Sequence, residues 1–342
     1  MARQALPVTA DVPAEIAAGL RRLGLAGPGP VRGEPLTGGV SSDVWRVDLP
    51  DGPVCAKRAL PRLKVEGDWR APTDRSGWEA RWLALAADLL PGAACRPLGY
   101  DADGHVLVLE WLDPFVHRVW KERLAAGDVD VPVAAEVGRR LAALHAGAAR
   151  GPLSEWEPAR ELFASLRIDP YLTATARAHP RLAPRFAALA EGLATAAITV
   201  IHGDVSPKNI LLGPDGPVLL DAECASPGDP AFDLAFCANH LLLKAVWRPA
   251  GRDRYIEAAR ALAAAYLDGV DWEPAGGPEA RAARLLPALA LARVDGLSPV
   301  EYLDEDARRT VRHAAADLVE RPPDGFAALT ARWLDLTSGE HA

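Results

Sequence analysis

The residues best suited to chemistry lie in one short stretch of the chain, between positions 202 and 223. His202-Gly203-Asp204 is followed by Asn209, and Asp221 and Glu223 come after the next apolar run. These residues supply three carboxylates and one amide. Phosphoryl transfer needs a carboxylate that accepts or orients a hydroxyl proton, together with oxygen ligands that hold Mg²⁺ on nucleotide phosphates. The pattern predicts this chemistry.

Three apolar runs place these polar groups. One run, 198–201, ends at His202, and another, 210–212, begins directly after Asn209. A turn at 214–216 and a third run, 218–220, then lead to Asp221. The ends of paired strands lie close together, so a hairpin would bring the acids and the amide into one site. The alternative is that they are turn residues and a strand cap, which is the usual role of any one of them alone.

Two features before this stretch could hold the phosphates. Gly38-Gly39-Val40-Ser41-Ser42 lies between two predicted strands, where its N–H groups and hydroxyls could face phosphate oxygens, although such a pair of glycines often only turns the chain. Lys57 ends the strand-like segment Val54-Cys55-Ala56-Lys57 and resembles the lysine of kinases that contacts the α- and β-phosphates. Only five of the 38 basic residues are lysines, which favours a function for Lys57 over a solvated lysine. Glu79 on the next helix is its predicted partner, with Asp74 and Glu66 as alternatives.

Other classes of protein lack support. The chain has no Gly-Lys pair of a Walker A loop, no GxGxxG and no GxSxG. The net charge of −8 argues against nucleic acid as a partner. Four cysteines without CxxC spacing make a zinc or disulfide framework improbable. The sequence shows no secretory signal and no apolar run of about 18 residues, so we expect a cytoplasmic protein without a membrane partner.

The periodicity divides the chain into two unlike halves. Up to about residue 110 it predicts a helix, about five strands and a second helix near 76–87; after 114 helices dominate. We therefore predict an α+β, two-lobed fold with a β-rich N-lobe at 1–112 and a mostly helical C-lobe at 113–342. The predicted helices of the second half span 133–144, 181–195, 230–246, 253–267, 279–293 and 305–319.

The string HGDxxxxN with its following Asp, the glycine turn and Lys57 resemble the aminoglycoside phosphotransferase and choline kinase superfamily, which has the protein-kinase-like fold. The HxDxxxxN spacing is that of the kinase catalytic loop, with Gly203 where an arginine is usual. The resemblance implies that Asp204 is the catalytic base and that Asn209 and Asp221 are Mg²⁺ ligands. It also implies that the nucleotide base binds at Glu110-Trp111-Leu112 and that Asp233 braces the catalytic loop.

Two segments are similar to the 5-methylthioribose kinase branch. These are 56–61 with 67–75, which includes Trp69 near the expected nucleotide, and Asp221-Ala222-Glu223, where the branch places a second carboxylate, here Glu223, at the metal. The acceptor region departs from that branch. Its adjacent arginines are missing at the aligned positions, 286–287, and Arg308-Arg309 lie further on. The kinase chemistry carries over, whereas the acceptor does not.

These observations predict an O-phosphotransferase that uses ATP or GTP with Mg²⁺ and acts on a free hydroxyl of a small molecule, as a monomer or a homodimer. The favoured acceptor is an antibiotic of the aminoglycoside or nucleoside type, and a sugar related to methylthioribose is the alternative. A nucleotide-binding pseudokinase is disfavoured because every catalytic position is filled. We expect His145 to be a core histidine, and the acidic run at 301–306 to be a solvated helix start rather than an acceptor patch.

Overall fold

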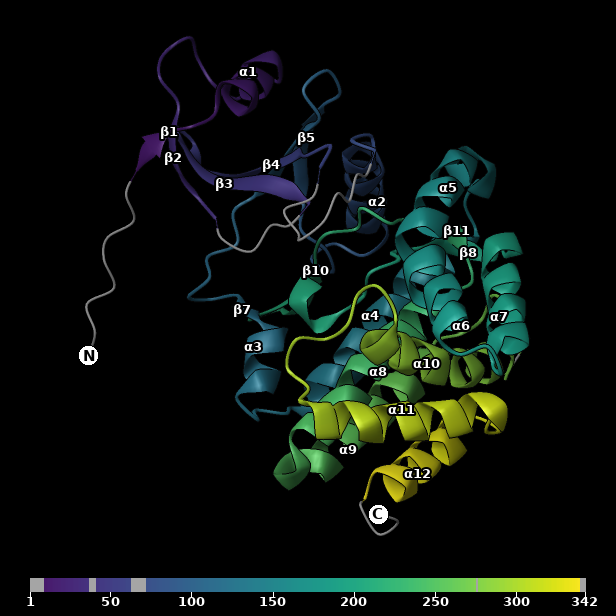
Figure 1. Ribbon diagram of the computed structural model, residues 1–342. Coiled ribbons are helices and arrows are strands. Elements are labelled where there is room, and N and C mark those ends of the chain that lie inside the picture. The colour runs from purple at the N-terminus through teal and green to yellow at the C-terminus, as the bar shows by residue number, and fades with distance from the viewer. Residues whose placement is uncertain (1–8, 37–40, 63–71, 275, 339–342) are drawn as a thin grey trace.

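The computed structural model describes residues 9–36, 41–62, 72–274 and 276–338, and these residues form two lobes of different architecture (Figure 1). The N-lobe contains a six-stranded antiparallel sheet in the order β1-β2-β3-β4-β6-β5. Two helices pack against it, α1 (Ala14–Arg22) and α2 (Arg75–Leu89). The strands are β1 (Ala10–Asp11), β2 (Arg32–Pro35), β3 (Ser42–Leu49), β4 (Gly52–Ala59), β5 (Pro97–Asp101) and β6 (Val106–Glu110).

Alternation along the strands decides which side chains face each helix. Val106 and Val108 of β6 pack with Ile16 and Leu20 of α1, whereas Leu107 and Leu109 belong to the main core with α2. Successive residues of a strand point to opposite faces of the sheet. Ala56 of β4 lies in the α1 cluster. Its neighbour Lys57 therefore projects from the other face, toward α2.

The C-lobe is built mainly of helices around one large apolar core. The long helices α4 (Val131–Ala149), α8 (Ala231–Trp247), α9 (Arg252–Asp268) and α10 (Gly277–Asp295) pack against one another. Helix α8 is buried over almost its whole length. The remaining helices are α3 (Trp120–Ala125), η1 (Leu153–Ala159), α5 (Arg160–Phe163), the π-helix η2 (Ala164–Thr173), α6 (Ala174–Ala178), α7 (Ala183–Thr195), η4 (Pro249–Gly251), α11 (Glu305–Glu320) and α12 (Phe326–Thr337).

Short strands in the C-lobe carry the loop between residues 202 and 209. Strand β8 (Thr199–Ile201) pairs with β11 (Ser226–Gly228), and β9 (Ile210–Gly213) pairs with β10 (Gly216–Leu219) and β7 (Arg118–Val119). The short helix η3 (Pro207–Asn209) closes the loop before β9. The predicted hairpin is confirmed for β9 and β10, and it places Asn209 and Asp221 near neighbouring strand ends, whereas the run 198–201 pairs outside it, with β11.

The lobes contact each other beside this loop. Leu219 of β10 exchanges backbone hydrogen bonds with the segment before β5, accepting from Cys95 N at 3.0 Å and donating to Ala93 O at 2.8 Å. The Trp82 ring of α2 meets the His202 ring edge-on at a centroid distance of 4.7 Å. The catalytic-loop candidates and the N-lobe sheet are therefore held in one arrangement.

The structure confirms the α+β, two-lobed prediction and adds elements that periodicity did not reveal. The short helical pieces between 153 and 178 and helix α12 were not predicted. Short helices bury too few periodic positions to leave a clear pattern. The division at residue 112/113 stays a prediction. Within the described residues, none of the helices is long and apolar enough to span a membrane.

Candidate active site

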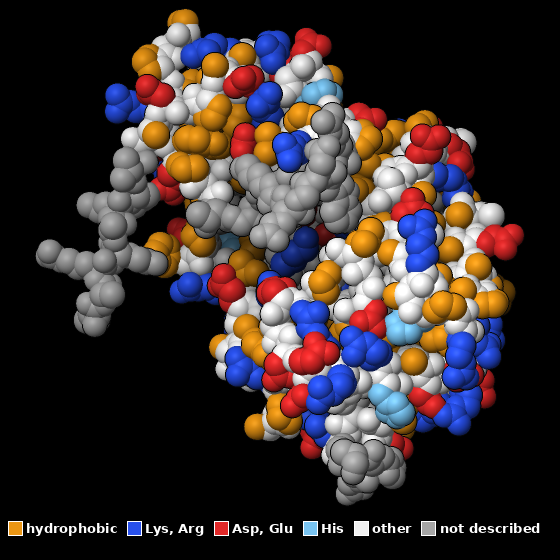
Figure 2. Space-filling model, in the orientation of Figure 1, with side chains coloured by type: hydrophobic (Ala, Val, Ile, Leu, Met, Phe, Trp, Pro, Cys, Tyr) orange, Lys and Arg blue, Asp and Glu red, His pale blue; other side chains and the backbone are white. Residues whose placement is uncertain are grey.

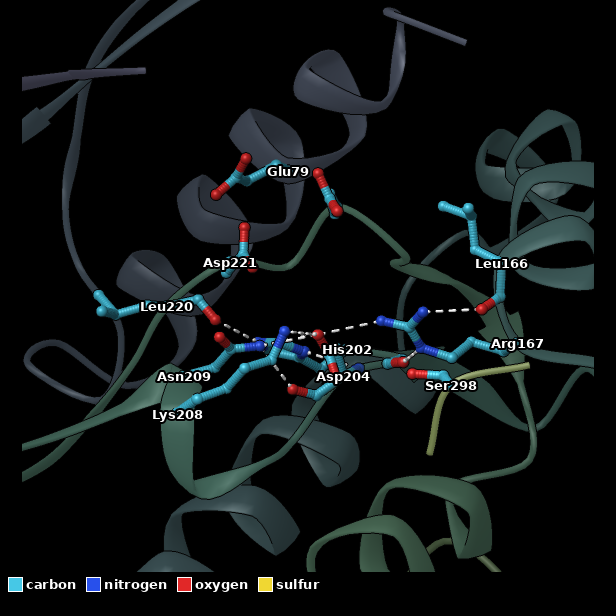
Figure 3. Close-up of polar contacts among 12 residues, drawn as sticks. Glu79, Leu166, Arg167, His202, Asp204, Lys208, Asn209, Leu220, Asp221 and Ser298 are labelled. Carbon is cyan, nitrogen blue, oxygen red and sulfur yellow. Dashed lines mark hydrogen bonds and ion pairs between the residues drawn. The ribbon is translucent and has the colours of Figure 1, made fainter. Parts of the chain in front are cut away.

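Asp204 lies at the centre of the site, buried and surrounded by cationic and amide groups (Figure 3). Its Oδ2 accepts a hydrogen bond from Asn209 Nδ2 at 2.9 Å and lies 3.0 Å from an Arg167 guanidinium nitrogen and 3.2 Å from Lys208 Nζ. Burial by itself raises the pKa of Asp204, but the charges of Arg167 and Lys208 bring it below its ordinary value. Asp204 is therefore ionised at neutral pH. Its other oxygen, Oδ1, forms no hydrogen bond with a described residue and is left for a ligand.

The backbone that presents Asp204 is braced from α8. Asp233 accepts hydrogen bonds from the backbone N–H groups of His202 and Gly203 at 2.7 and 2.9 Å, as the sequence predicted for a brace of this loop. His145 Nε2 donates to the same carboxylate at 3.2 Å, and its Nδ1 pairs with the Tyr266 hydroxyl at 2.9 Å. The prediction that His145 is a satisfied core histidine is confirmed.

His202 is also part of this support. It accepts from the Asp204 backbone N–H through Nδ1 at 3.1 Å and donates through Nε2 to the Leu220 carbonyl at 3.0 Å. Both nitrogens are used by backbone groups, which fixes the neutral tautomer. Burial lowers the pKa of His202, in agreement with that neutral form. His202 thereby joins the loop at Asp204 to the end of the strand that leads to Asp221.

A second charged cluster joins the two lobes. Lys57 Nζ of β4 lies 2.8 Å from a Glu79 carboxylate oxygen of α2 and forms an ion pair with Asp221 from the C-lobe. Burial lowers the pKa of Lys57, but the charges of Asp221 and Glu79 outweigh it, so its pKa lies well above the ordinary value. Burial raises the pKa of Glu79 to about 7, against the opposing effect of Lys57. Glu79 contacts Lys57, as predicted. Of the two alternatives, Asp74 forms no hydrogen bond or ion pair with Lys57, and Glu66 lies outside the described residues.

Three oxygen-bearing residues lie beside these clusters. Asn209 uses its amide nitrogen on Asp204, so its carbonyl oxygen has no partner among the described residues. Asp221 uses Oδ1 for Lys57, and Glu223 uses Oε2 for Arg75 at 3.1 Å, which leaves one carboxylate oxygen of each without a described partner. Such a set of neutral and anionic oxygens fits a hard divalent cation. In the described ranges, no three His, Cys, Asp or Glu side chains are grouped closely enough to hold a metal by themselves.

The predicted phosphate and base contacts are only partly described. Gly38 and Gly39, and also Trp69, fall outside the described residues. Ser41 accepts the Leu60 N–H at 3.0 Å through its carbonyl, and the Ser42 hydroxyl is buried with no hydrogen-bond partner among described residues. Glu110 accepts from the Arg96 N–H at 2.8 Å through its side chain. Leu112 follows β6, and its backbone makes no hydrogen bond with described residues.

Two residues at the site were missed by sequence reasoning. Arg167 comes from the π-helix η2, a region without a recognisable pattern, and its Nε also donates to the Gly203 carbonyl at 2.6 Å. In a chain that uses arginine almost everywhere, nothing marked this one. Lys208 did carry a signal, because it is one of only five lysines and lies inside the motif itself.

The acidic run after α10 has the structural role that we expected. Asp304 caps α11 by accepting the Ala307 N–H at 2.8 Å, and Glu305 and Asp306 occupy the first turn of that helix. Glu301 lies apart from them and pairs with Lys121 of α3 at 2.6 Å.

A two-lobed fold with a buried, braced Asp204 and an interlobe Lys–Glu–Asp cluster defines the protein-kinase-like class of phosphotransferases. Comparison with family models confirms the class, because the phosphotransferase enzyme family (APH) matches residues 32–277. The chain belongs to this family. The match to the family confirms the predicted superfamily and the predicted phosphotransferase activity. It does not confirm the similarity to the methylthioribose kinase branch.

Solved structures show the same fold at low sequence identity. The amicoumacin kinase hAmiN, in complex with AMP-PNP, Ca²⁺ and Ami, is 14% identical with a TM-score of 0.57, covering 87% of this chain and 91% of that one. The macrolide 2′-phosphotransferase MphH from Brachybacterium faecium is 19% identical with a TM-score of 0.50, covering 90% and 98%. The search of curated proteins found no significant match.

Proposed function

We propose that the protein transfers the γ-phosphoryl group of ATP or GTP to a hydroxyl group of a small molecule. The observation that carries the proposal is the state of Asp204, whose Oδ2 is held by three groups while its Oδ1 has no partner among the described residues. A carboxylate held in this way can accept a hydrogen bond from one substrate hydroxyl and fix the direction of its attack.

The transfer is a direct displacement. The acceptor oxygen forms a bond to the γ-phosphorus while the bond between that phosphorus and the β,γ-bridging oxygen breaks, and the nucleoside diphosphate leaves. The hydroxyl proton passes to Asp204. Because the pKa of Asp204 is low, we assign it mainly to orientation, with proton transfer late in the reaction. Lys57, held by Glu79, would contact the donor phosphates.

The divalent ion and the nucleotide are assigned to residues of this chain. Asn209, Asp221 and Glu223 would hold Mg²⁺ through their free oxygens, and the ion would neutralise charge on the β- and γ-phosphates. Gly38, Gly39, Ser41 and Ser42 would contact the phosphates, and the backbone at Glu110 and Leu112 would contact the base. The hAmiN complex with AMP-PNP and Ca²⁺ supports a nucleotide and a divalent cation in this fold.

The candidate acceptors remain an antibiotic of the aminoglycoside or nucleoside type and a sugar related to methylthioribose. The structure gives no support to Arg308 and Arg309 as sugar-binding residues. Arg308 donates to the carbonyls of Leu303 and Val300, and Arg309 pairs with Asp306 on the surface. A cytoplasmic location, a monomeric or homodimeric state and the absence of nucleic-acid partners stay predictions from the sequence.

The first test is the substitution Asp204→Asn. A panel of antibiotics and sugars is incubated with labelled ATP or GTP and Mg²⁺, and phosphorylated products are detected by mass spectrometry. We expect Asp204→Asn to lower the rate of transfer by about 10²–10⁴-fold, which is the usual contribution of a positioned proton acceptor. Binding of the nucleotide, measured by calorimetry, should stay nearly the same.

The matched control is Asp306→Asn, which removes a carboxylate from the exposed start of α11. It should leave transfer unchanged. If Asp204→Asn retains the rate of the wild type, Asp204 does not have the assigned role.

A further inference from the structure

Among the described residues, three lysines of the C-lobe, Lys121, Lys208 and Lys244, lie in one region around His240. Of the five lysines, four lie in described segments: Lys57, Lys121, Lys208 and Lys244. Lys57 and Lys208 belong to the active site. Lys244 and Lys121 lie close enough to His240 for their charges, with those of Arg293 and Lys208, to lower its pKa beyond the effect of burial. In the view of Figure 2, basic side chains are visible in the hollow between the two lobes.

One face of α8 leads from the catalytic carboxylate to Lys244. Arg167, which contacts Asp204, lies over the Phe236 ring at 5.8 Å, and the His240 ring meets Phe236 edge-on at 5.5 Å. Positions 236, 240 and 244 are four residues apart, so they share one face of the helix. At a rise of 1.5 Å per residue, Lys244 lies about 12 Å along the axis from Phe236.

Lys244 is buried without a counter-charge. Lys244 is only 1% exposed, and its ammonium forms no hydrogen bond or ion pair with any described residue. The nearest groups are the rings of Tyr302 and Trp247, at 4.2 and 5.7 Å. A buried ammonium normally has a carboxylate partner. Burial lowers the pKa of Lys244 to about 8, as expected for a cation that lacks one.

A second cation in the same region also lacks an acidic partner. Arg293 of α10 donates to the Tyr171 hydroxyl at 3.2 Å and to the Ser298 hydroxyl at 2.8 Å, and its buried Nε has no partner among described residues. Figure 3 shows Ser298 beside Arg167. The segment 296–304 therefore runs next to the active site before Tyr302 covers Lys244. The only nearby carboxylate in the described cluster, Glu301, is already paired with Lys121.

We infer that this face of α8, together with Arg293 and the segment 296–304, binds an acidic group of the acceptor. The hydroxyl to be phosphorylated would lie at Asp204, and the anionic end would pair with Lys244, about two helical turns along α8 from Phe236. The inference rests on the proposed phosphotransferase function and narrows its substrate class. It disfavours an aminoglycoside, because a molecule with several ammonium groups would face Lys244, Arg293 and Lys121. A hydroxy acid or another acceptor with one anionic group fits the charge of the region.

The test compares ligands that differ only in charge. The probes are 6-hydroxyhexanoate, 8-hydroxyoctanoate and 10-hydroxydecanoate, the methyl ester of each acid, and the amino alcohol of each length. Binding to the full chain is measured by calorimetry without nucleotide. At least one acid should bind about tenfold or more tightly than its ester, which is the range for a hydrogen bond to a charged group, and the amino alcohols should bind worst.

The substitution Lys244→Met removes the cation and keeps the length of the side chain. We expect it to abolish the preference for the acid over the ester. Its melting temperature should be equal to or higher than that of the wild type, since a buried charge without a partner is removed. A purely structural lysine would give the opposite change in stability and would leave the acid preference intact. The matched control, Arg309→Met, removes an exposed cation from α11 and should keep the preference.

Three results would each overturn the inference. The wild type could bind acids and esters equally, it could bind none of the probes, or Lys244→Met could keep the preference for the acid.

A failure of the proposed function would give a different result. If acids bind as expected but no hydroxyl compound is phosphorylated with ATP or GTP, the function is wrong and the anion site stands. If esters or amino alcohols are phosphorylated as well as acids, the function stands and the charge preference is wrong.

Discussion

The charges around Asp204 decide how this single carboxylate can act. Arg167 and Lys208 both approach Oδ2, and Asn209 donates to the same atom. These contacts keep the residue ionised and fix its side-chain torsions, so that only Oδ1 is available to a hydroxyl. A strongly stabilised carboxylate is a weak base but a good orienting group, which suits a reaction that depends on positioning more than on proton removal.

The contribution of Arg167 can be tested by its effect on pH dependence. Its charge lowers the pKa of Asp204, so Arg167→Met should raise that pKa and move the acid limb of the pH–rate profile to higher pH. Arg167→Lys keeps the charge and should retain most of the original profile. The measurement is kcat/KM against pH with a phosphorylated acceptor. A profile in Arg167→Met that coincides with the wild type would contradict the assignment.

At the level of secondary-structure elements, the loop between β8 and η3 depends on a backbone conformation that only glycine adopts easily. Gly203 has φ of +77°, and an added Cβ would lie 2.5 Å from the Cys224 carbonyl oxygen. This explains why the position carries glycine where protein kinases have arginine. Asp221, just after β10, has φ of +64°, which is strained for a residue other than glycine. Asp221 is held in place by its ion pair with Lys57, and the Gly203 backbone is held by Asp233.

Gly203→Ala should therefore damage both stability and activity. We expect a loss of about 1–3 kcal/mol in the free energy of unfolding, from the unfavourable φ and the contact with Cys224, and a large loss of phosphoryl transfer because Asp204 moves with the backbone. Denaturant unfolding and product formation measure the two effects. Gly192→Ala in α7 is the control, since nothing lies within 4 Å of the added Cβ. It should be neutral or stabilising by up to about 1 kcal/mol. Equal effects of the two substitutions would contradict this account.

The protein as a whole is organised so that the nucleotide would complete the contact between the lobes. Lys57 of the sheet pairs with Asp221 of the helical lobe, and Trp82 packs against His202. Lys57, which would contact the phosphates, lies on the N-lobe side of this contact. Asn209, Asp221 and Glu223, each with an oxygen that has no described partner, lie on the C-lobe side. A magnesium nucleotide would bind to groups from both lobes at once.

Addition of ATP or its analogue AMP-PNP with Mg²⁺ should therefore raise the melting temperature of the whole chain. At a nucleotide concentration of 100 times Kd, the expected gain is about 2.7 kcal/mol in the free energy of unfolding. EDTA should remove most of the gain, because the phosphates would then meet the carboxylates without a cation between them. Scanning calorimetry measures both effects. A nucleotide that leaves the melting temperature unchanged, or a gain that survives EDTA in full, would contradict the assigned site.

The sequence by itself determined the fold class, the strand pairing of 210–219 and the choice of Lys57, Glu79, Asp204, Asn209, Asp221 and Glu223 as candidate site residues. The fold class and the strand pairing follow from local rules, because strand alternation and turn residues act over short stretches of chain. The roles of the candidate residues rest on motif spacing and on the family resemblance. The position of Arg167 at Asp204, the use of Oδ2 by Arg167, Lys208 and Asn209, and the burial of Lys244 without a described counter-charge were decided only by the tertiary structure. They depend on how η2, α8 and α10 pack around the loop at 202–209. That packing is set by apolar faces that lie far apart in the sequence.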